Sequence, residues 1–197
     1  AVNVYDYTDR EGKLLYRVIR YEPKDFRQQR ADGAWTMDGV TRVLYRLPEV
    51  IAAVGRKEKI YVCEGEKDAD SLSALGVCGT TASGGAGKWQ DAYAEALIGS
   101  EVVVLADRDE PGRAHARQVA QSLSVAARSV RILELPAGKD PSDWLASGGT
   151  KLALEVLVDD TPEWQSSEKV IYTARDLATE YREVISKRIA GDLEYVG

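Results

Sequence analysis

From residue 59 onward, short apolar runs alternate with segments of helical period, and this alternation constrains the fold more than any other feature of the sequence. Strands separated by helical crossovers pair in parallel, because the chain returns to the same end of the sheet before the next strand begins. We therefore expect an α/β fold in which a mainly parallel sheet carries helices on both faces. The sequence predicts strands over 60–63, 77–82, 101–106 and 129–135, and helices over 67–75, 89–97, 112–123 and 141–146.

The segments on either side of this region have different patterns. Residues 1–47 are rich in aromatic and aliphatic residues interrupted by turn-forming sequences, which is typical of antiparallel strands. Residues 174–189 place apolar side chains along one stripe of a helix, and such a stripe needs a partner surface. We expect a small β-rich subdomain over 1–58, the parallel-sheet domain over 59–160, and a linker with a C-terminal helix over 161–197.

The amino-acid composition indicates which cellular compartment and which metal cofactors to expect. The 197 residues are 44% apolar and 29% charged with a formal net charge of -6, so any contact with nucleic acid must be local. No run approaches the roughly 20 apolar residues of a membrane span, and no secretory-signal pattern is present, which favours the cytoplasm and no membrane partner. Two cysteines and one histidine cannot form a four-ligand zinc site, so we expect no zinc in this fragment. The first residue is alanine, and we expect a piece of a longer protein.

Acidic side chains follow two of the predicted strands at the point where each strand ends. Glu64 comes directly after the strand over 60–63, and Asp107 and Asp109 follow the strand over 101–106. The carboxyl ends of parallel strands meet at one edge of the sheet, where ligands bind. Carboxylates gathered there repel one another unless a cation lies among them, and oxygen-only ligands select a hard ion such as Mg²⁺ or Mn²⁺. The sequence therefore predicts a metal site built from Glu64, Asp107 and Asp109.

Each acidic group also has a simpler interpretation. Glu64 and its neighbours can be an ordinary acidic helix start, and the residues from Asp107 onward can be a polar turn that caps a helix. Asp68 lies one helical turn beyond Glu64, where it could bind a metal through water or be a surface residue. Asp140 and Asp143 are weaker candidates, because Asp-Pro-Ser-Asp is also a good helix start. Two acidic groups that each follow a parallel strand and precede a helix favour a shared site.

Three segments resemble the motifs of TOPRIM domains. Residues 61–69, Tyr-Val-Cys-Glu-Gly-Glu-Lys-Asp-Ala, are similar to the glutamate motif of these domains. Residues 104–113, Val-Leu-Ala-Asp-Arg-Asp-Glu-Pro-Gly-Arg, are similar to their aspartate-x-aspartate motif. Residues 135–145, with their lysine-aspartate-proline sequence, resemble a segment of bacterial and phage-type primases that topoisomerases lack. The resemblance covers about residues 59–150 and implies the TOPRIM domain of a DNA primase or primase-helicase.

The resemblance implies a metal-dependent nucleotidyltransferase, the catalytic core of a DNA primase. Such an enzyme joins nucleoside triphosphates into primers on a single-stranded DNA template and releases pyrophosphate. The resemblance assigns Glu64, Asp107 and Asp109 as catalytic and metal-binding residues, with Asp68 as a further metal ligand and Mg²⁺ or Mn²⁺ as cofactor. It also implies a replicative helicase domain as a partner, in the same chain or in a separate one.

Basic residues provide candidate contacts to nucleotide and DNA. The glycine-rich sequence 84–88 does not match a Walker motif, but it could bring backbone N–H groups near a triphosphate. Residues 13–46 interleave basic and aromatic residues, a combination that suits single-stranded template, although the same region could be a β-rich cap with an aromatic core. The candidates are Lys67, Lys88, Arg113 and Lys139 around the site and Arg17, Arg20 and Arg27 in the front segment, and each could instead be a solvated side chain.

Two other classes of function remain open. A TOPRIM nuclease would use the same carboxylates to direct water at a phosphodiester, although the primase-like third segment disfavours it. A non-catalytic replication module would bind DNA or tether a helicase. No helicase motor motif lies within the sequence, so ATP-driven unwinding is not expected of this chain.

Overall fold

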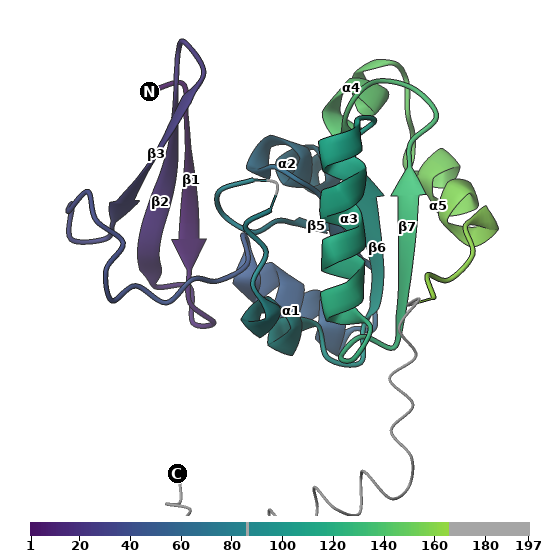
Figure 1. The fold of residues 1–197 in the computed structure, drawn as a ribbon, viewed down its shortest axis with the longest axis horizontal. Coiled ribbons are helices and arrows are strands. Elements are labelled where there is room, and N and C mark those ends of the chain that lie inside the picture. The colour runs from purple at the N-terminus through teal and green to yellow at the C-terminus, as the bar shows by residue number, and fades with distance from the viewer. Residues whose placement is uncertain (86, 166–197) are drawn as a thin grey trace, which may run out of the picture. The chain divides into compact units, whose positions relative to one another are not determined.

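Two β-sheets organise residues 1–85 and 87–165, the part of the chain that this computed structural model describes (Figure 1). The first sheet is antiparallel, with β1 (Asn3–Thr8), β2 (Leu14–Tyr21) and β3 (Asp25–Arg30) in that spatial order. The second is parallel, and its strands lie in the order β5 (Cys78–Thr80), β4 (Ile60–Val62), β6 (Glu101–Ala106) and β7 (Ser129–Glu134). The predicted α/β class with a small preceding β-rich part is confirmed. The helix predicted over 174–189 lies outside the described residues.

The helices cover both faces of the parallel sheet, as predicted. The side chains of β6 alternate, so Val102 and Val104 belong to one core and Val103 and Leu105 to the other. Nearly all of β6 is buried, as expected of a parallel strand that is covered on both sides. The first core is completed by α1 (Leu47–Gly55), the 3₁₀ helix η1 (Asp91–Leu97) and α3 (Glu110–Leu123). The second core is completed by α2 (Glu66–Ala74), α4 (Pro141–Ala146) and α5 (Lys151–Asp160). Figure 1 shows α3 in front of the sheet and α5 beside β7.

The small sheet packs one face into the second core through tyrosine side chains. Tyr7 on β1 and Tyr16 on β2 are paired in the sheet and fully buried, and their rings stack with centroids 4.6 Å apart. Both side chains point into the second core, and the face of the small sheet that carries them is called the inner face below. Its aromatic packing explains why the front segment of the sequence is rich in tyrosine.

The third strand of the small sheet has no clear signal in the sequence. β3 reads Asp-Phe-Arg-Gln-Gln-Arg, in which Phe26 is the only large apolar residue, so no hydrophobic alternation marks a strand. It forms because β2 offers a second edge to pair with, and its residues are exposed or half-buried. Elsewhere the predicted helix over 89–97 is shorter and is the 3₁₀ helix η1. No helix among the described residues is long and apolar enough to cross a membrane.

Candidate active site

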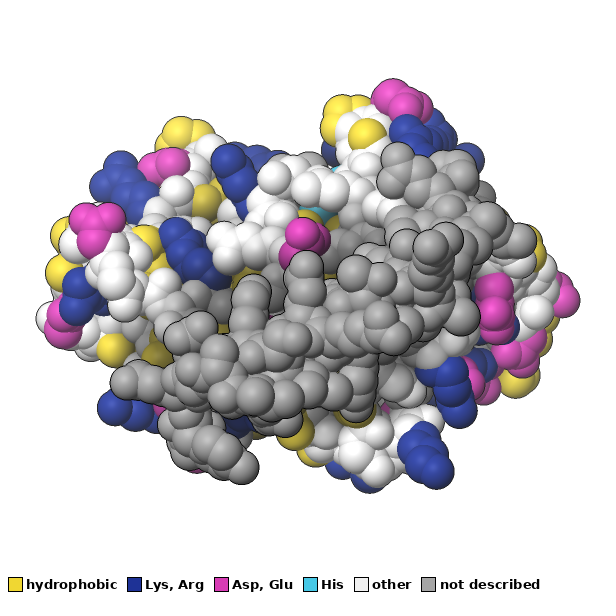
Figure 2. Space-filling view, turned by 60° about the horizontal axis from the view of Figure 1, so that its bottom comes forward, with side chains coloured by type: hydrophobic (Ala, Val, Ile, Leu, Met, Phe, Trp, Pro, Cys, Tyr) yellow, Lys and Arg dark blue, Asp and Glu magenta, His cyan; other side chains and the backbone are white. Residues whose placement is uncertain are grey.

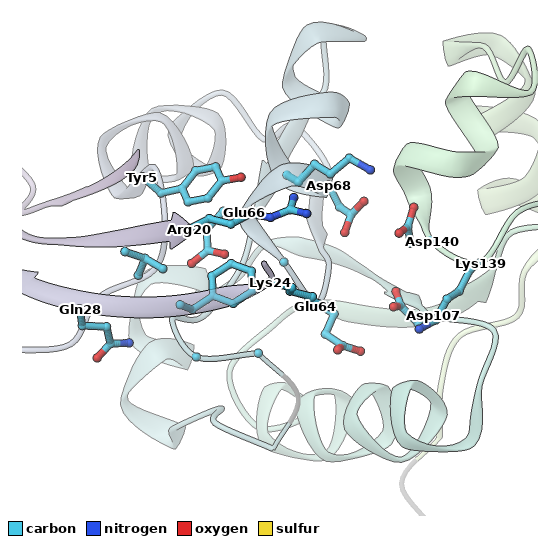
Figure 3. A pocket seen from close by; sticks show the side chains of 16 residues that line it. Tyr5, Arg20, Lys24, Gln28, Glu64, Glu66, Asp68, Asp107, Lys139 and Asp140 are labelled. Carbon is cyan, nitrogen blue, oxygen red and sulfur yellow. The ribbon is translucent and has the colours of Figure 1, made fainter. Parts of the chain in front are cut away.

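A cavity of about 600 Å³ opens between the inner face of the small sheet and the carboxyl edge of the parallel sheet (Figure 3). Its volume falls within the range of nucleotide-sized and drug-sized ligand sites. Figure 3 shows the basic side chain of Arg20 reaching in from the small sheet and acidic side chains on the opposite wall. The small sheet contributes Arg20, Lys24, Phe26 and Gln28, and the opposite wall contributes Glu64, Asp68, Asp107, Lys139 and Asp140.

Glu64 and Asp107 enter this cavity from neighbouring strands. β4 and β6 are hydrogen-bonded in parallel with Val62 opposite Val104, so the residues that follow the two strands leave the sheet at the same edge. Asp107 is only 8% exposed, and its Oδ1 is buried without a hydrogen-bond partner among the described residues. Burial raises the pKa of Asp107 to about 7, and the charge of Glu64 is the next cause. Burial, followed by the charge of Asp109, also raises the pKa of Glu64.

Asp109 has a different role in the structure from Asp107. Its Oδ1 accepts a 2.8 Å hydrogen bond from the backbone N–H of Gly112 and so caps α3, while its Oδ2 pairs with Nζ of Lys139 at 3.1 Å. The hydrogen bond from Gly112, and then Lys139, lower the pKa of Asp109. Side chains point alternately to opposite sides only along the strand, and after Asp107 the chain turns into α3, so Asp109 does not point the same way as Asp107. Asp109 is therefore not part of the cavity lining.

Asp68 is buried rather than exposed on the surface of α2. Its Oδ1 accepts a 3.0 Å hydrogen bond from the backbone N–H of Ser142 in the first turn of α4, so it ties the two helices together. Burial raises the pKa of Asp68, and Ser142 opposes that effect. Asp140, which also lines the cavity, caps α4 by accepting a 2.8 Å hydrogen bond from the N–H of Asp143.

Two of the four predicted metal ligands remain free to bind a cation. Among residues 1–85 and 87–165, no three His, Cys, Asp or Glu side chains are gathered so as to hold a metal ion. N–H donors engage Asp68 and Asp109, whereas no described residue donates a hydrogen bond to the carboxylate of Glu64 or to Oδ1 of Asp107. Mg²⁺ in phosphoryl-transfer sites is usually held by one or two carboxylates, with water and substrate phosphates as the other ligands. The residues present therefore fit a hard cation held by Glu64 and Asp107.

Of the seven predicted basic residues, three line the cavity and four do not. Lys67, Lys139 and Arg20 line the cavity. Arg17 lies on the other face of β2 and pairs with Asp6 at 2.8 Å, because neighbouring strand residues point in opposite directions. Figure 2 shows Lys and Arg side chains in small separate groups among acidic and hydrophobic ones, where described residues are visible on that face.

The other three predicted cations lie outside the cavity lining. Arg27 stands over the ring of Tyr21 at 5.2 Å on the outer face of the small sheet. Nε of Arg113 donates a 2.7 Å hydrogen bond to Glu134. The side chain of Lys88 runs beside Gly84, within the glycine-rich loop. Each of these cations is held by a local partner or lies in a loop.

The same loop reaches the cavity through Gly84 and Gly85. The N–H of Gly87 donates a 3.1 Å hydrogen bond to Nδ1 of His115, which is buried in α3. Burial lowers the pKa of His115, which keeps its imidazole neutral and able to accept this hydrogen bond. The only histidine of the chain thus anchors the glycine-rich loop.

Several cavity residues were not predicted individually as site residues, although Lys24 and Phe26 lie in the basic and aromatic segment 13–46. Lys24, Phe26 and Gln28 belong to β3 or to the turn before it, and Glu66 begins α2. Recognition of β3 as a strand would have placed Phe26 and Gln28 on one face, because they are two residues apart. The polar composition of β3 hides that signal.

Comparison with known proteins identifies the family. A family model described as Toprim-like matches residues 61–145. The Gene 57 protein of Mycobacterium phage D29 is 33% identical over 111 residues, which cover 56% of this chain and 70% of that protein. The DNA primase of Listeria monocytogenes serovar 1/2a is 28% identical over 138 residues, which cover 68% of this chain and 22% of the primase. The chain thus spans less than a quarter of the length of that primase.

Solved structures of primases share the fold. The DnaG catalytic core has a TM-score of 0.61 at 22% identity, with 81% of this chain and 53% of that chain covered. The primase fragment of the bacteriophage T7 primase-helicase has a TM-score of 0.57 at 25% identity, with 79% of this chain and 61% of that chain covered. This chain therefore belongs to the Toprim-like family and carries a TOPRIM domain of the primase type.

Proposed function

We propose that this chain forms the catalytic part of a DNA primase, which makes primers on single-stranded DNA by metal-dependent nucleotidyl transfer in the cytoplasm. One observation carries the proposal: the unpartnered carboxylates of Glu64 and Asp107 face a wall of basic and aromatic side chains across a cavity large enough for a nucleotide. The Toprim-like match and the primase relatives support it. Among the solved structures of the same fold is a DnaG primase catalytic domain bound to single-stranded DNA.

Glu64 and Asp107 would hold a divalent ion, Mg²⁺ or Mn²⁺. When bound, this ion supplies positive charge that stabilises the transferring phosphoryl group and the leaving pyrophosphate. The raised pKa values of half-buried Glu64 and buried Asp107 are consistent with this role, because a bound cation favours the ionised form of both acids. Asp109 positions α3 as its cap and lies next to Asp107, and it would join the site when its partner Lys139 turns to a phosphate.

Cations on both walls would orient the triphosphate. Lys67 and Lys139 come from the TOPRIM side, and Arg20 comes from the small sheet. In the reaction, the 3′-hydroxyl of one nucleotide attacks the α-phosphate of the next, its proton passes to water or to Glu64, and the bond to pyrophosphate breaks. The basic side chains neutralise the charge that leaves with pyrophosphate.

The proposal includes the partners. Nucleoside triphosphates and a single-stranded template would occupy the cavity and its mouth. A replicative helicase domain, in the same chain or in another one, would be the replication partner, because a primase-helicase fragment is among the solved relatives. The division into 1–58, 59–160 and 161–197 belongs to the same proposal.

Primer synthesis by the full-length protein is the direct test. The protein is incubated with a single-stranded template and labelled nucleoside triphosphates, with Mg²⁺ or Mn²⁺ or with a chelator. We expect extension products only with the metal, and we expect Asp107→Asn to reduce them by at least about 100-fold. Asp159→Asn is the matched control, because Asp159 is an exposed acid on α5 that pairs with Lys59 outside the cavity.

Three results would overturn the proposal. Equal primer extension by Asp107→Asn and the parent would show that the carboxylates take no part in the reaction. Metal-dependent cleavage of labelled single strands without extension would indicate a nuclease. Binding of DNA by a parent protein that neither extends nor cleaves would indicate a non-catalytic replication module.

A further inference from the structure

The small sheet presents an aromatic and amide surface to the cavity that the carboxylate chemistry does not use. Phe26 and Gln28 alternate along β3, so both project from the inner face, and both line the cavity. Phe26 is 46% exposed, although the aromatic rings of Tyr7 and Tyr16 on the same face are fully buried. The ring of Phe26 is therefore an apolar surface that a ligand in the cavity can contact.

The amide of Gln28 is held in one orientation. Nη1 of Arg42 donates a 2.7 Å hydrogen bond to Oε1 of Gln28. Arginine has only donors, so the amide oxygen must face Arg42 and the NH₂ group must point the other way. Arg42 is itself fixed, because the same nitrogen lies 3.2 Å from Oγ of Ser83 and its guanidinium stands 5.5 Å over the ring of Tyr16. The NH₂ group of Gln28 is therefore a pre-oriented donor.

A cation lies directly beside this surface. Arg20 on β2 is the cross-strand partner of Phe26, and Val18 is the partner of Gln28. Nε of Arg20 is buried and has no hydrogen-bond partner among residues 1–85 and 87–165. Arg20, Lys24 and Gln28 line the same cavity as Glu64 and Asp107, and Figure 3 shows Arg20 reaching in from β2 toward the opposite wall. A ligand here meets an aromatic face, a hydrogen-bond donor and positive charge on one side and the acidic edge on the other.

We propose that Phe26 and Gln28 form a platform for an unpaired nucleobase. The base stacks on the ring of Phe26, and the NH₂ group of Gln28 donates a hydrogen bond to an acceptor on the base edge. The phosphates then extend toward Arg20 and the Glu64–Asp107 edge. This inference rests on the proposed function and deepens it, because it names the residues that hold the base rather than the phosphates.

The chemistry of the surface explains why the ligand is a base. Aromatic stacking accepts every base, since each has a π-face, and it is the usual way to hold single-stranded nucleic acid. Gln28 adds discrimination, because a fixed donor favours bases with an acceptor at the matching position. The base belongs either to the template strand or to a nucleoside triphosphate, and both share this chemistry.

Fluorescence of 2-aminopurine tests the platform, because stacking quenches it. The full chain is titrated with a single-stranded oligomer that contains 2-aminopurine and, separately, with 2-aminopurine ribonucleoside triphosphate. We expect Phe26→Leu to weaken binding roughly 5- to 100-fold and to abolish quenching in at least one of these titrations, whereas Phe26→Tyr stays within about twofold of the parent. A loss with the oligomer assigns the platform to the template, and a loss with the triphosphate assigns it to the nucleotide.

Two further variants separate the contributions. Gln28→Met has a similar shape without the donor, and we expect binding about fivefold weaker with quenching retained. Trp35→Leu is the matched control, because Trp35 is a 59% exposed aromatic residue that does not line the cavity. Its binding and quenching should equal those of the parent. An equal loss in Trp35→Leu and Phe26→Leu would overturn the proposal.

Mn²⁺ binding, followed by electron paramagnetic resonance, distinguishes failure of the platform from failure of the proposed function. Phe26→Leu should bind Mn²⁺ like the parent, and Asp107→Asn should not. If Phe26→Leu matches the parent with both fluorescent probes while the parent makes primers, the platform is wrong and the primase assignment stands. If quenching depends on Phe26 but the parent makes no primers with any metal, the platform stands as a base-binding surface and the assignment fails.

Discussion

Tyr7 donates a 2.8 Å hydrogen bond to Oε1 of Glu66 and so links the small sheet to the first turn of α2. Both partners are buried, with Tyr7 fully covered and Glu66 only 7% exposed. The hydroxyl of Tyr16 makes a similar link to Oγ of Ser83 at 3.1 Å. Tyrosine hydroxyls thus hold together the two walls of the cavity.

Tyr7→Phe should destabilise the protein. The substitution keeps the ring stacked on Tyr16 but removes the side-chain donor of the buried carboxylate of Glu66, which costs about 1–3 kcal/mol. Urea denaturation at neutral pH measures the free energy of unfolding. Glu66→Gln keeps an acceptor for Tyr7 and should cost less, because burial raises the pKa of Glu66 and disfavours its charge. An unchanged midpoint for Tyr7→Phe would contradict the link.

Substitutions of Asp109 should separate its capping role from its charge. Asp109→Asn retains an oxygen that can accept from Gly112, whereas Asp109→Ala removes the cap of α3 and should cost about 1 kcal/mol more of unfolding free energy. Both variants lose the carboxylate charge beside Asp107, so both should lose primer synthesis to a similar degree. Thermal unfolding and primer extension are compared in parallel. Equal stability of the two variants would mean that the cap contributes nothing.

Stability without metal should fall as the pH rises from about 4 to about 7. Burial and the charge of Glu64 raise the pKa of Asp107 from 3.8 to about 7, so within this window the folded protein holds a proton that the unfolded chain has released. The unfolded state is then favoured by rising pH, by an amount on the order of 2 kcal/mol for this group. The difference between the parent and Asp107→Asn isolates the effect, and a slope identical in both would contradict it.

Binding of Mg²⁺ should release a proton at mildly acidic pH. The cation favours ionised Asp107, so its binding at a pH of about 6 displaces the proton held there, and binding at a pH of about 8 displaces much less. Calorimetry in two buffers with different ionisation enthalpies measures the number of protons released. Removal of the ion by a chelator should restore the pH dependence of the metal-free protein. Proton release that is the same at both pH values would exclude Asp107 as the source.

Gly112→Ala should disturb Asp107 directly. A Cβ at residue 112 would lie 2.6 Å from Cβ of Asp107 and 2.8 Å from its carbonyl oxygen, so α3 could no longer approach the end of β6 this closely. We expect a loss of about 1–3 kcal/mol in unfolding free energy and weaker Mn²⁺ binding. Gly55→Ala is the control, because a Cβ there meets nothing within 4 Å, and it should be neutral or slightly stabilising. Parent-like Mn²⁺ affinity in Gly112→Ala would show that the close approach does not position Asp107.

Much of the fold could be predicted because its signals are local. The strand over Glu101–Ala106 and the helix over Pro141–Ala146 have the predicted bounds, since one is an uninterrupted apolar run and the other begins with an Asp cap followed by proline. The strand β3 could not be predicted, because pairing with β2 rather than its own composition makes it a strand.

The sequence by itself determined which acids stand at the ends of parallel strands, because strand polarity and helix start signals lie within a few neighbouring residues. Only the tertiary structure decided which of those acids remain free. Asp68 lines the cavity but accepts a hydrogen bond from Ser142, which is distant in the chain, and Asp109 caps α3 outside the cavity lining. Glu64 and Asp107 are therefore left in the cavity wall with carboxylate oxygens that no described residue donates to. The same holds for the cations: Arg17 and Arg20 have similar sequence surroundings, but the packing of the small sheet places Arg20 in the cavity and Arg17 on the outer face. Burial and partners that come from distant segments set these outcomes, and no local pattern encodes them.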